Sequence, residues 1–383
     1  MVDDTYRSPW QVDDVAELAS LSRRFFTTEA APRRAEWAAQ RHVDRVFWRQ
    51  AAKLGLLCAG VPAEYGGGGG DARHDLVVIA EQARAGEFGF GNAVHSGVVA
   101  RYLVTYGTDG QKRRWLPPMA SGDVIAGIAL TEPEAGSDLK AIRTRAERDG
   151  DGWRVSGAKT FVTNGGSADL LVVAAKTNAS AGARGISLFL VPVGDQPGVV
   201  RGRVLDKIGQ ESADTSDITL DDVRLPAEAL LGRENAGYAM LLDQLSWERL
   251  LVGVMAAAVT ERAVELTVAY AHQRMVYDDE LFALQHVRME LAECATLAQV
   301  GRVFVDHCVT RHLDGTLDAR TASMAKFWLS DVQCQVLDRC LQLHGANGYT
   351  RDYPIGQLYV DARAQRIYGG ANEVMKELIA GTL

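Results

Sequence analysis

The sequence predicts an α+β multidomain protein with three parts: an N-terminal helical domain over residues 1–122, a small β-barrel or sandwich domain over 123–235, and a C-terminal four-helix bundle over 236–383. Apolar residues follow a helical period in the first part. Short strand-like runs with glycine-rich turns fill the second part, and long helical stripes return in the third. With 383 residues, 47% of them apolar, the chain can fill more than one core.

The first part is predicted to be helical from Asp13 to about Ser121. Residues 37–57 and 93–106 are amphipathic stretches, and we expect breaks at the glycine run 66–70 and at Pro117-Pro118. The glycine run has no strand before it and no Gly-Lys-Ser/Thr after it, so it does not fit a phosphate-binding loop. We expect a surface loop there.

The middle part contains short runs with the composition of β-strands. They are Trp153–Val155, Leu170–Ala175, Ile186–Pro192 and Ile218–Leu220. Glycine-rich and polar turns separate them, which predicts a small β unit.

The last part begins with a helix predicted from Gly237 to about Arg274, apolar nearly all round, as expected at the centre of a bundle. Residues 284–305 carry a second apolar stripe at helical spacing. Ala319–His344 form a third long helix that ends at Gly345. These three segments predict the bundle.

Composition excludes several classes of protein. With 41 basic and 49 acidic residues, the net charge of −8 argues against a broad nucleic-acid surface. The chain does not open with a basic start followed by an apolar stretch, and no apolar run has the length of a membrane span, so we expect a soluble cytoplasmic protein. The five cysteines form no C-x-x-C pair and the eight histidines no H-E-x-x-H motif, so we expect reduced thiols and no metal.

One acidic residue stands on an apolar stripe of the first long helix. The stripe consists of Leu241, Leu245, Glu248, Val252, Met255 and Val259, spaced by four and three. An unpaired charge in that position is costly. Either an ion pair neutralises Glu248, with Arg249 as the nearest partner, or the site uses a base whose pKa is raised by loss of water.

Two segments of the β part combine hydroxyls and backbone N–H groups around a flat apolar face: Ile128–Asp138 and Lys159–Gly166. They resemble the acyl-CoA dehydrogenase family, whose members place the flavin ring of FAD against the β domain. The other matching motifs, in chain order, are Glu64–Gly67, Gly107-Thr108, Gln111-Lys112, Arg114–Pro117, Asp222–Pro226, Leu341–Tyr349 and Ile367–Gly370. The resemblance therefore covers almost the whole chain.

The resemblance implies where the catalytic base lies. The family's reaction requires a carboxylate that removes the α proton of a thioester, donors for the enolate oxygen, and a flavin that accepts the β hydride. Many members carry the carboxylate after an Ile-Tyr pair, where this chain has Gly369. Relatives of the long-chain and isovaleryl types instead carry it in a Glu-Arg-Leu sequence on the long helix, which matches Glu248–Leu250. The resemblance thus implies that Glu248 is the base and that the Gly369 N–H binds the thioester oxygen.

The resemblance also implies a set of binding residues. Those expected to contact FAD are Ile128, Leu130, Thr131, Ser137, Phe161, Thr163, Arg274, Gln342, Gly345, Ala346 and Glu373, and those expected near the substrate are Ser137, Arg249 and Tyr368. In the family, the arginine and the glutamine-glycine turn come from a neighbouring subunit, which implies an oligomer, most simply a homotetramer. Three of these residues have simpler explanations: Phe161 as a strand core residue, Ser137 as a turn former and Glu373 as a first-turn acid.

The chain departs from the family pattern near the expected FAD phosphates. Arg274 is followed by Met-Val-Tyr-Asp-Asp rather than aromatic-Gly-Lys, although a solvated turn explains the two carboxylates at 278 and 279. Ala346 replaces a frequent glycine, and Ala371 replaces a Thr or Ser. We therefore expect FAD affinity to be reduced but not lost.

The expected function is FAD-dependent conversion of an acyl-CoA thioester to the trans-2-enoyl thioester in fatty acid metabolism, with electrons passed to an electron-transferring flavoprotein. Three alternatives remain open. The thiol carrier could be an acyl carrier protein. The chain could be a non-catalytic acyl-binding subunit paired with an active paralogue, which Gly369, Asp278 and Ala371 would favour. Finally, it could be a flavin oxidase or monooxygenase on the same scaffold.

Overall fold

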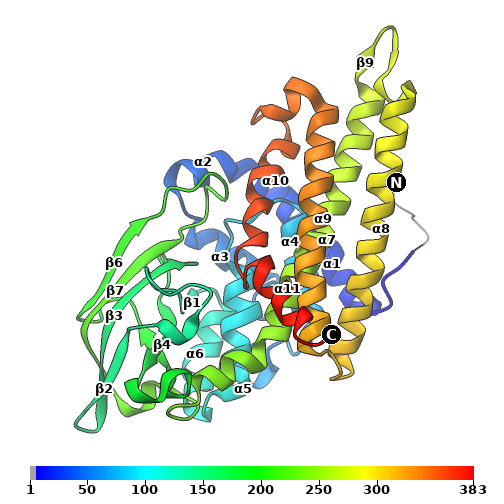
Figure 1. The fold of residues 1–383 in the computed structure, drawn as a ribbon. Coiled ribbons are helices and arrows are strands. Elements are labelled where there is room, and N and C mark those ends of the chain that lie inside the picture. The colour runs from blue at the N-terminus through cyan, green and yellow to red at the C-terminus, as the bar shows by residue number, and fades with distance from the viewer. Residues whose placement is uncertain (1–5) are drawn as a thin grey trace.

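The computed structural model describes residues 6–383. Figure 1 shows the three predicted parts: helices of the N-terminal part beside a twisted sheet, with long helices forming the other side of the molecule. The predicted fold class is confirmed. None of the helices in residues 6–383 is both long enough and apolar enough to cross a membrane.

The N-terminal part consists of short helices. They are α1 (Asp13–Phe25), α2 (Arg34–Gln40), α3 (Arg45–Lys53), α4 (Ala72–Arg84), the π-helical segment η4 (Ala93–Ala100), α5 (Arg101–Tyr106) and α6 (Asp109–Ala120). The expected helical stretch 37–57 is divided because Arg41 ends α2 in the left-handed conformation, with φ of 61°. Thr108 begins α6 through a capping box with Gln111.

The break expected at Pro117-Pro118 is wrong. Both prolines lie inside the last turns of α6, which ends at Ala120. Each proline removes one N–H bond, to the carbonyls of Arg113 and Arg114 four residues earlier. Both arginines are exposed, so water can satisfy the carbonyls that the helix leaves unpaired.

The β part is one eight-stranded sheet. Its strands are β1 (Ala126–Ala129), β2 (Arg145–Asp149), β3 (Gly152–Val162), β4 (Leu170–Lys176), β5 (Ile186–Pro192), β6 (Val199–Val204), β7 (Ser216–Leu225) and β8 (Leu230–Leu231). The order is β6-β7-β3-β2-β4-β5-β8, and β1 pairs in parallel with β4. The charged strand β2 and the largely exposed β6 lack the apolar runs by which the other strands are recognised.

The C-terminal part has three long helices and two short ones. They are α7 (Gly237–Gln273), α8 (Gln285–Leu313), α9 (Ala319–His344), α10 (Pro354–Ala362) and α11 (Asn372–Ala380). Helix α7 is apolar on nearly every side because it packs against α4, α8 and α9. A hairpin of β9 (Met275–Val276) and β10 (Asp279–Glu280) extends α7 beyond the bundle (Figure 1). Asp278 lies at its exposed tip, as expected of a solvated turn.

Candidate active site

Glu248 lies in the N-terminal third of α7 and is partly buried. The Tyr102 hydroxyl, on α5, donates a hydrogen bond of 3.0 Å to Oε1 of Glu248. Within residues 6–383, the Glu248 carboxylate has no other side-chain hydrogen bond and no ion pair. Burial raises the pKa of Glu248 to about 7, although the Tyr102 hydrogen bond and the positive charge of Arg249 both act to lower it. This carboxylate therefore exchanges a proton near neutral pH.

Arg249 does not form the alternative ion pair with Glu248. The Arg249 side chain is buried, and its Nη1 donates to the Ser323 hydroxyl on α9 at 3.1 Å. Its Nε has no hydrogen-bond partner in the described part of the chain. Arg249 thus lies on the side of α7 that faces α9, while its neighbour Glu248 faces α5.

Gly369 lies in the segment Tyr368–Ala371, called here the strap, which connects α10 to α11 by way of a short 3₁₀ turn. Gly369 has φ of 65°, a left-handed conformation that glycine adopts without strain. A Cβ atom added at Gly369 would lie 3.3 Å from Cγ2 of Val252. Val252 is one helical turn after Glu248, so the strap packs against α7 beside the acid. The structure therefore brings the two predicted catalytic residues to one place.

Polar side chains of α9 hold the end of the strap. Lys326 is fully buried, and its Nζ donates to the Gly370 carbonyl at 2.5 Å and to Oδ1 of Asn372 at 2.8 Å. The Asn372 amide donates in turn to Ser330 Oγ at 3.0 Å and to Asp331 Oδ1 at 2.9 Å. Lys326 was not predicted as a site residue from the sequence. The signal for it is the same as for Glu248, because a charged residue stands among the apolar residues that α9 (Ala319–His344) buries.

The two segments expected to contact the flavin lie side by side. The backbone N–H of Thr160 donates to the Thr131 carbonyl at 2.9 Å. The buried Lys159 donates to the Leu130 carbonyl at 3.1 Å and to Oε1 of Glu132 at 2.8 Å. These bonds fix the strand ends that carry Leu130 and Thr131.

Phe161 could have been an ordinary residue of the sheet core. The structure excludes this, because 66% of the residue is exposed and its φ is 55°. Thr163, two residues further along the chain, is partly buried. Ile128 and Leu130 are also partly buried, and Ser137 is exposed in the following turn. An exposed aromatic ring beside hydroxyls and short apolar side chains fits one face and edge of a flavin.

A second group of predicted FAD residues lies far from Glu248. Arg274 follows the C-terminal end of α7, 26 residues after Glu248, and this separation corresponds to about 39 Å of helix. The Tyr270 hydroxyl donates to the His344 carbonyl at 3.2 Å, which joins this end of α7 to the end of α9. The residues gathered there are Arg274, Gln342, Gly345 and Ala346, and all are exposed. Glu373 belongs to neither group, because it begins α11 near the strap, where Tyr368 also lies.

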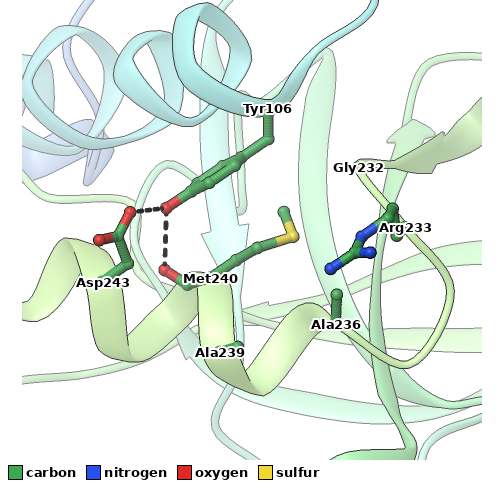
Figure 2. A pocket seen from close by; sticks show the side chains of 7 residues that line it. All are labelled: Tyr106, Gly232, Arg233, Ala236, Ala239, Met240 and Asp243. Atoms are coloured by element: carbon green, nitrogen blue, oxygen red, sulfur yellow. Dashed lines mark hydrogen bonds between the residues drawn. The ribbon is translucent and has the colours of Figure 1, made fainter.

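Neither described pocket contains Glu248 or the strap. The first, about 290 Å³, lies between the end of α5 and the start of α7 (Figure 2). There the Tyr106 hydroxyl donates to the Asp243 carboxylate and to the Met240 carbonyl. The second, about 270 Å³, lies on the sheet beside Glu132 and Arg143. The candidate site is therefore placed at Glu248 and Gly369 rather than at either cavity.

Trp247 flanks the acid on α7. Its indole N–H donates to the Gly97 carbonyl of η4 at 2.6 Å. The Arg101 guanidinium lies 4.5 Å from the indole centre, and the His312 ring of α8 lies 4.7 Å from it. These contacts fix the rotation of α7 at the residue before Glu248.

Comparisons with known proteins cover nearly the whole chain. The N-terminal, middle and C-terminal domains of acyl-CoA dehydrogenase match residues 13–123, 127–223 and 235–383. The long-chain specific acyl-CoA dehydrogenase of Sus scrofa mitochondria is 45% identical over 360 residues, 94% of this chain and 84% of that protein. A 3-(aryl)acrylate reductase of Clostridium sporogenes is 33% identical, over 96% of this chain and 97% of that protein.

Solved structures give the same result. An acyl-CoA dehydrogenase from Geobacillus kaustophilus has a TM-score of 0.95 and 38% identity, over 98% of this chain and 99% of that one. A glutaryl-CoA dehydrogenase from Mycobacterium smegmatis, solved with FADH2, has a TM-score of 0.91 and 28% identity, over 99% of this chain and 96% of that one. The chain belongs to the acyl-CoA dehydrogenase family and is an oxidoreductase.

Proposed function

We propose that the chain catalyses FAD-dependent α,β-dehydrogenation of an acyl-CoA thioester, with Glu248 as the base. One observation carries the proposal: a left-handed glycine of the strap packs against α7 beside a partly buried acid whose pKa is about 7. A base must be ionised yet basic at working pH, and this pKa meets both conditions. The product is the trans-2-enoyl thioester.

Each residue of the candidate site has a separate proposed role. Glu248 removes the α proton through a carboxylate oxygen, and the Gly369 N–H donates to the thioester oxygen as negative charge develops there. Ser137, Arg249 and Tyr368 remain the proposed substrate contacts. Bound FAD supplies the acceptor for the β hydride. The groups proposed to position it are Phe161, Thr163, Thr131 and the apolar residues of β1.

A second copy of the chain would complete the cofactor site. Within one chain, Arg274 and the turn at Gln342–Ala346 lie at the far end of α7 from Glu248. A cation with open backbone donors suits a pyrophosphate, so these residues would serve the cofactor of a neighbouring subunit in a homotetramer. The proposed electron acceptor is an electron-transferring flavoprotein.

The proposed role of Glu248 is tested by anaerobic bleaching of the flavin with a panel of straight, branched and carrier-linked acyl thioesters. We expect Glu248→Gln to yield a folded, yellow protein that substrate no longer bleaches, because the amide cannot accept the α proton. The matched control is Asp243→Asn, an acid on the same helix that also accepts from a tyrosine, and it should bleach normally.

Three results would contradict the proposal. Full bleaching by Glu248→Gln would exclude it as the base. A purified chain without flavin absorbance, even after FAD is added, would favour a non-catalytic acyl-binding subunit. Rapid formation of peroxide without an added acceptor would favour an oxidase.

A further inference from the structure

We propose that Tyr102 is a positioning residue for the base: its hydroxyl holds Oε1 of Glu248, which directs Oε2 toward the α carbon of the thioester. The inference rests on the proposed function and adds to it a residue that acts through Glu248. Tyr102 comes from the N-terminal part of the chain, 146 residues before the base.

Burial and packing fix the position of the Tyr102 side chain against Glu248. The Tyr102 side chain is 1% exposed, and its ring packs against Tyr106 with 5.8 Å between ring centres. Tyr106, one turn further along α5, donates to Asp243, as Figure 2 shows. The two tyrosines thus form a short seam between α5 and α7, with one carboxylate of α7 on each hydroxyl.

The other charged or titratable groups around Glu248 are engaged elsewhere. On α5, Arg101 donates through Nε to Gln244 at 3.0 Å and stacks on Trp247. On α8, the His312 ring packs against Trp247 in a tilted arrangement, and burial lowers the pKa of His312 to about 4, so that it is neutral at pH 7.

The remaining elements supply no second donor in the described part of the chain. Arg249 of α7 donates to Ser323, and Lys326 of α9 donates to the strap and to Asn372. Asp75 of α4 accepts from the Gly60 backbone, and Tyr368 of the strap makes no hydrogen bond to Glu248. Tyr102 is therefore the one group of residues 6–383 that donates to this carboxylate.

This arrangement has a chemical consequence. A hydrogen bond donated to a carboxylate stabilises the ionised form, whereas burial favours the neutral form. The Tyr102 hydroxyl thus limits the rise in the pKa of a partly buried acid, so that a substantial fraction of it is ionised near neutral pH. Since the bond occupies one oxygen, it leaves the other free to receive the substrate proton in a fixed orientation.

The test compares Tyr102→Phe with Tyr106→Phe by single-turnover flavin bleaching, in the holoenzyme, from pH 5.5 to 9. Tyr106→Phe removes the neighbouring hydroxyl and leaves the Glu248 contact intact. In Tyr102→Phe the carboxylate loses one hydrogen bond, which raises the pKa of Glu248. We therefore expect the low-pH side of the plot of bleaching rate against pH to shift to higher pH by about 1 to 2 units. In Tyr106→Phe the bleaching rate should fall at the same pH as in the parent protein.

The outcomes separate this inference from the proposed function. If the parent does not bleach with any thioester, or Glu248→Gln bleaches fully, the proposed function fails first. If the parent bleaches, Glu248→Gln does not, and Tyr102→Phe lowers the rate equally at every pH, the tyrosine has only a packing role and the inference is wrong. An equal shift of the low-pH side in both tyrosine variants would also overturn it. Thermal melting and flavin absorbance of each variant confirm that folded holoenzyme is compared.

Discussion

The raised pKa of Glu248 predicts that this residue lowers the free energy of unfolding of the protein, by an amount that depends on pH. The pKa is about 7 in the folded chain and 4.5 in its ordinary environment. Because the folded pKa is the higher one, the folded chain binds this proton more tightly, and stability falls as pH rises from about 4.5 to 7. A difference of about 2.5 pH units corresponds to about 3 kcal/mol once the pH is above both values.

Replacement of Glu248 by glutamine removes this titration and keeps an oxygen that can accept from Tyr102. We expect Glu248→Gln to be more stable than the parent by about 1 kcal/mol at pH 5 and about 3 kcal/mol at pH 8. The measurement is the thermal unfolding midpoint of both proteins, with excess FAD, at the two pH values. The gain should be larger at pH 8 and should accompany loss of bleaching.

The control is Glu17→Gln on the exposed side of α1, where the structure shows no ion pair for the carboxylate. It should leave the unfolding midpoint unchanged at both pH values. If Glu248→Gln were stabilised equally at pH 5 and pH 8, burial of the charge would not be the cause. If it were destabilised at pH 8, the reasoning from desolvation would be refuted.

Two further predictions concern the strap and the distant FAD group. Lys326→Met should destabilise the protein by about 1–3 kcal/mol, because the Gly370 carbonyl and Asn372 lose a buried donor, and it should slow bleaching; unchanged melting and rate would contradict this role. Arg274→Ala should lower the flavin retained after gel filtration, with the exposed Arg24→Ala as control, and equal retention in both would argue against a phosphate contact at residue 274.

The fold was predictable where apolar periodicity is strong. Helix α7 begins and ends within a residue of the predicted bounds, because a buried central helix needs a continuous apolar pattern. Weakly patterned elements were harder to predict: the charged β2 and the exposed β6 have no apolar run. The helix break predicted at the proline pair in α6 is wrong, since a helix near its end on an exposed side tolerates the missing donors.

For the candidate site, the sequence predicted the burial of Glu248 because an acid interrupting an apolar stripe is visible in one helix. The Tyr102 contact could not be predicted in this way, since it joins residues 146 apart and depends on how α5 packs on α7. Lys326 was detectable but was not singled out. The separation of Arg274 from Glu248 follows from helix length alone, and it agrees with the family resemblance, which implies that this arginine serves a neighbouring subunit.

The close approach of the strap to Val252 couples two positions that lie 117 residues apart in the chain. A side chain at 369 would have to adopt a left-handed backbone and push against a valine methyl at 3.3 Å. A single replacement that introduced an acid at position 369 would therefore carry a cost in stability. Homologous sequences that carry a side chain there should more often have a smaller residue at the position of Val252, a pattern of covariation that an alignment can reveal.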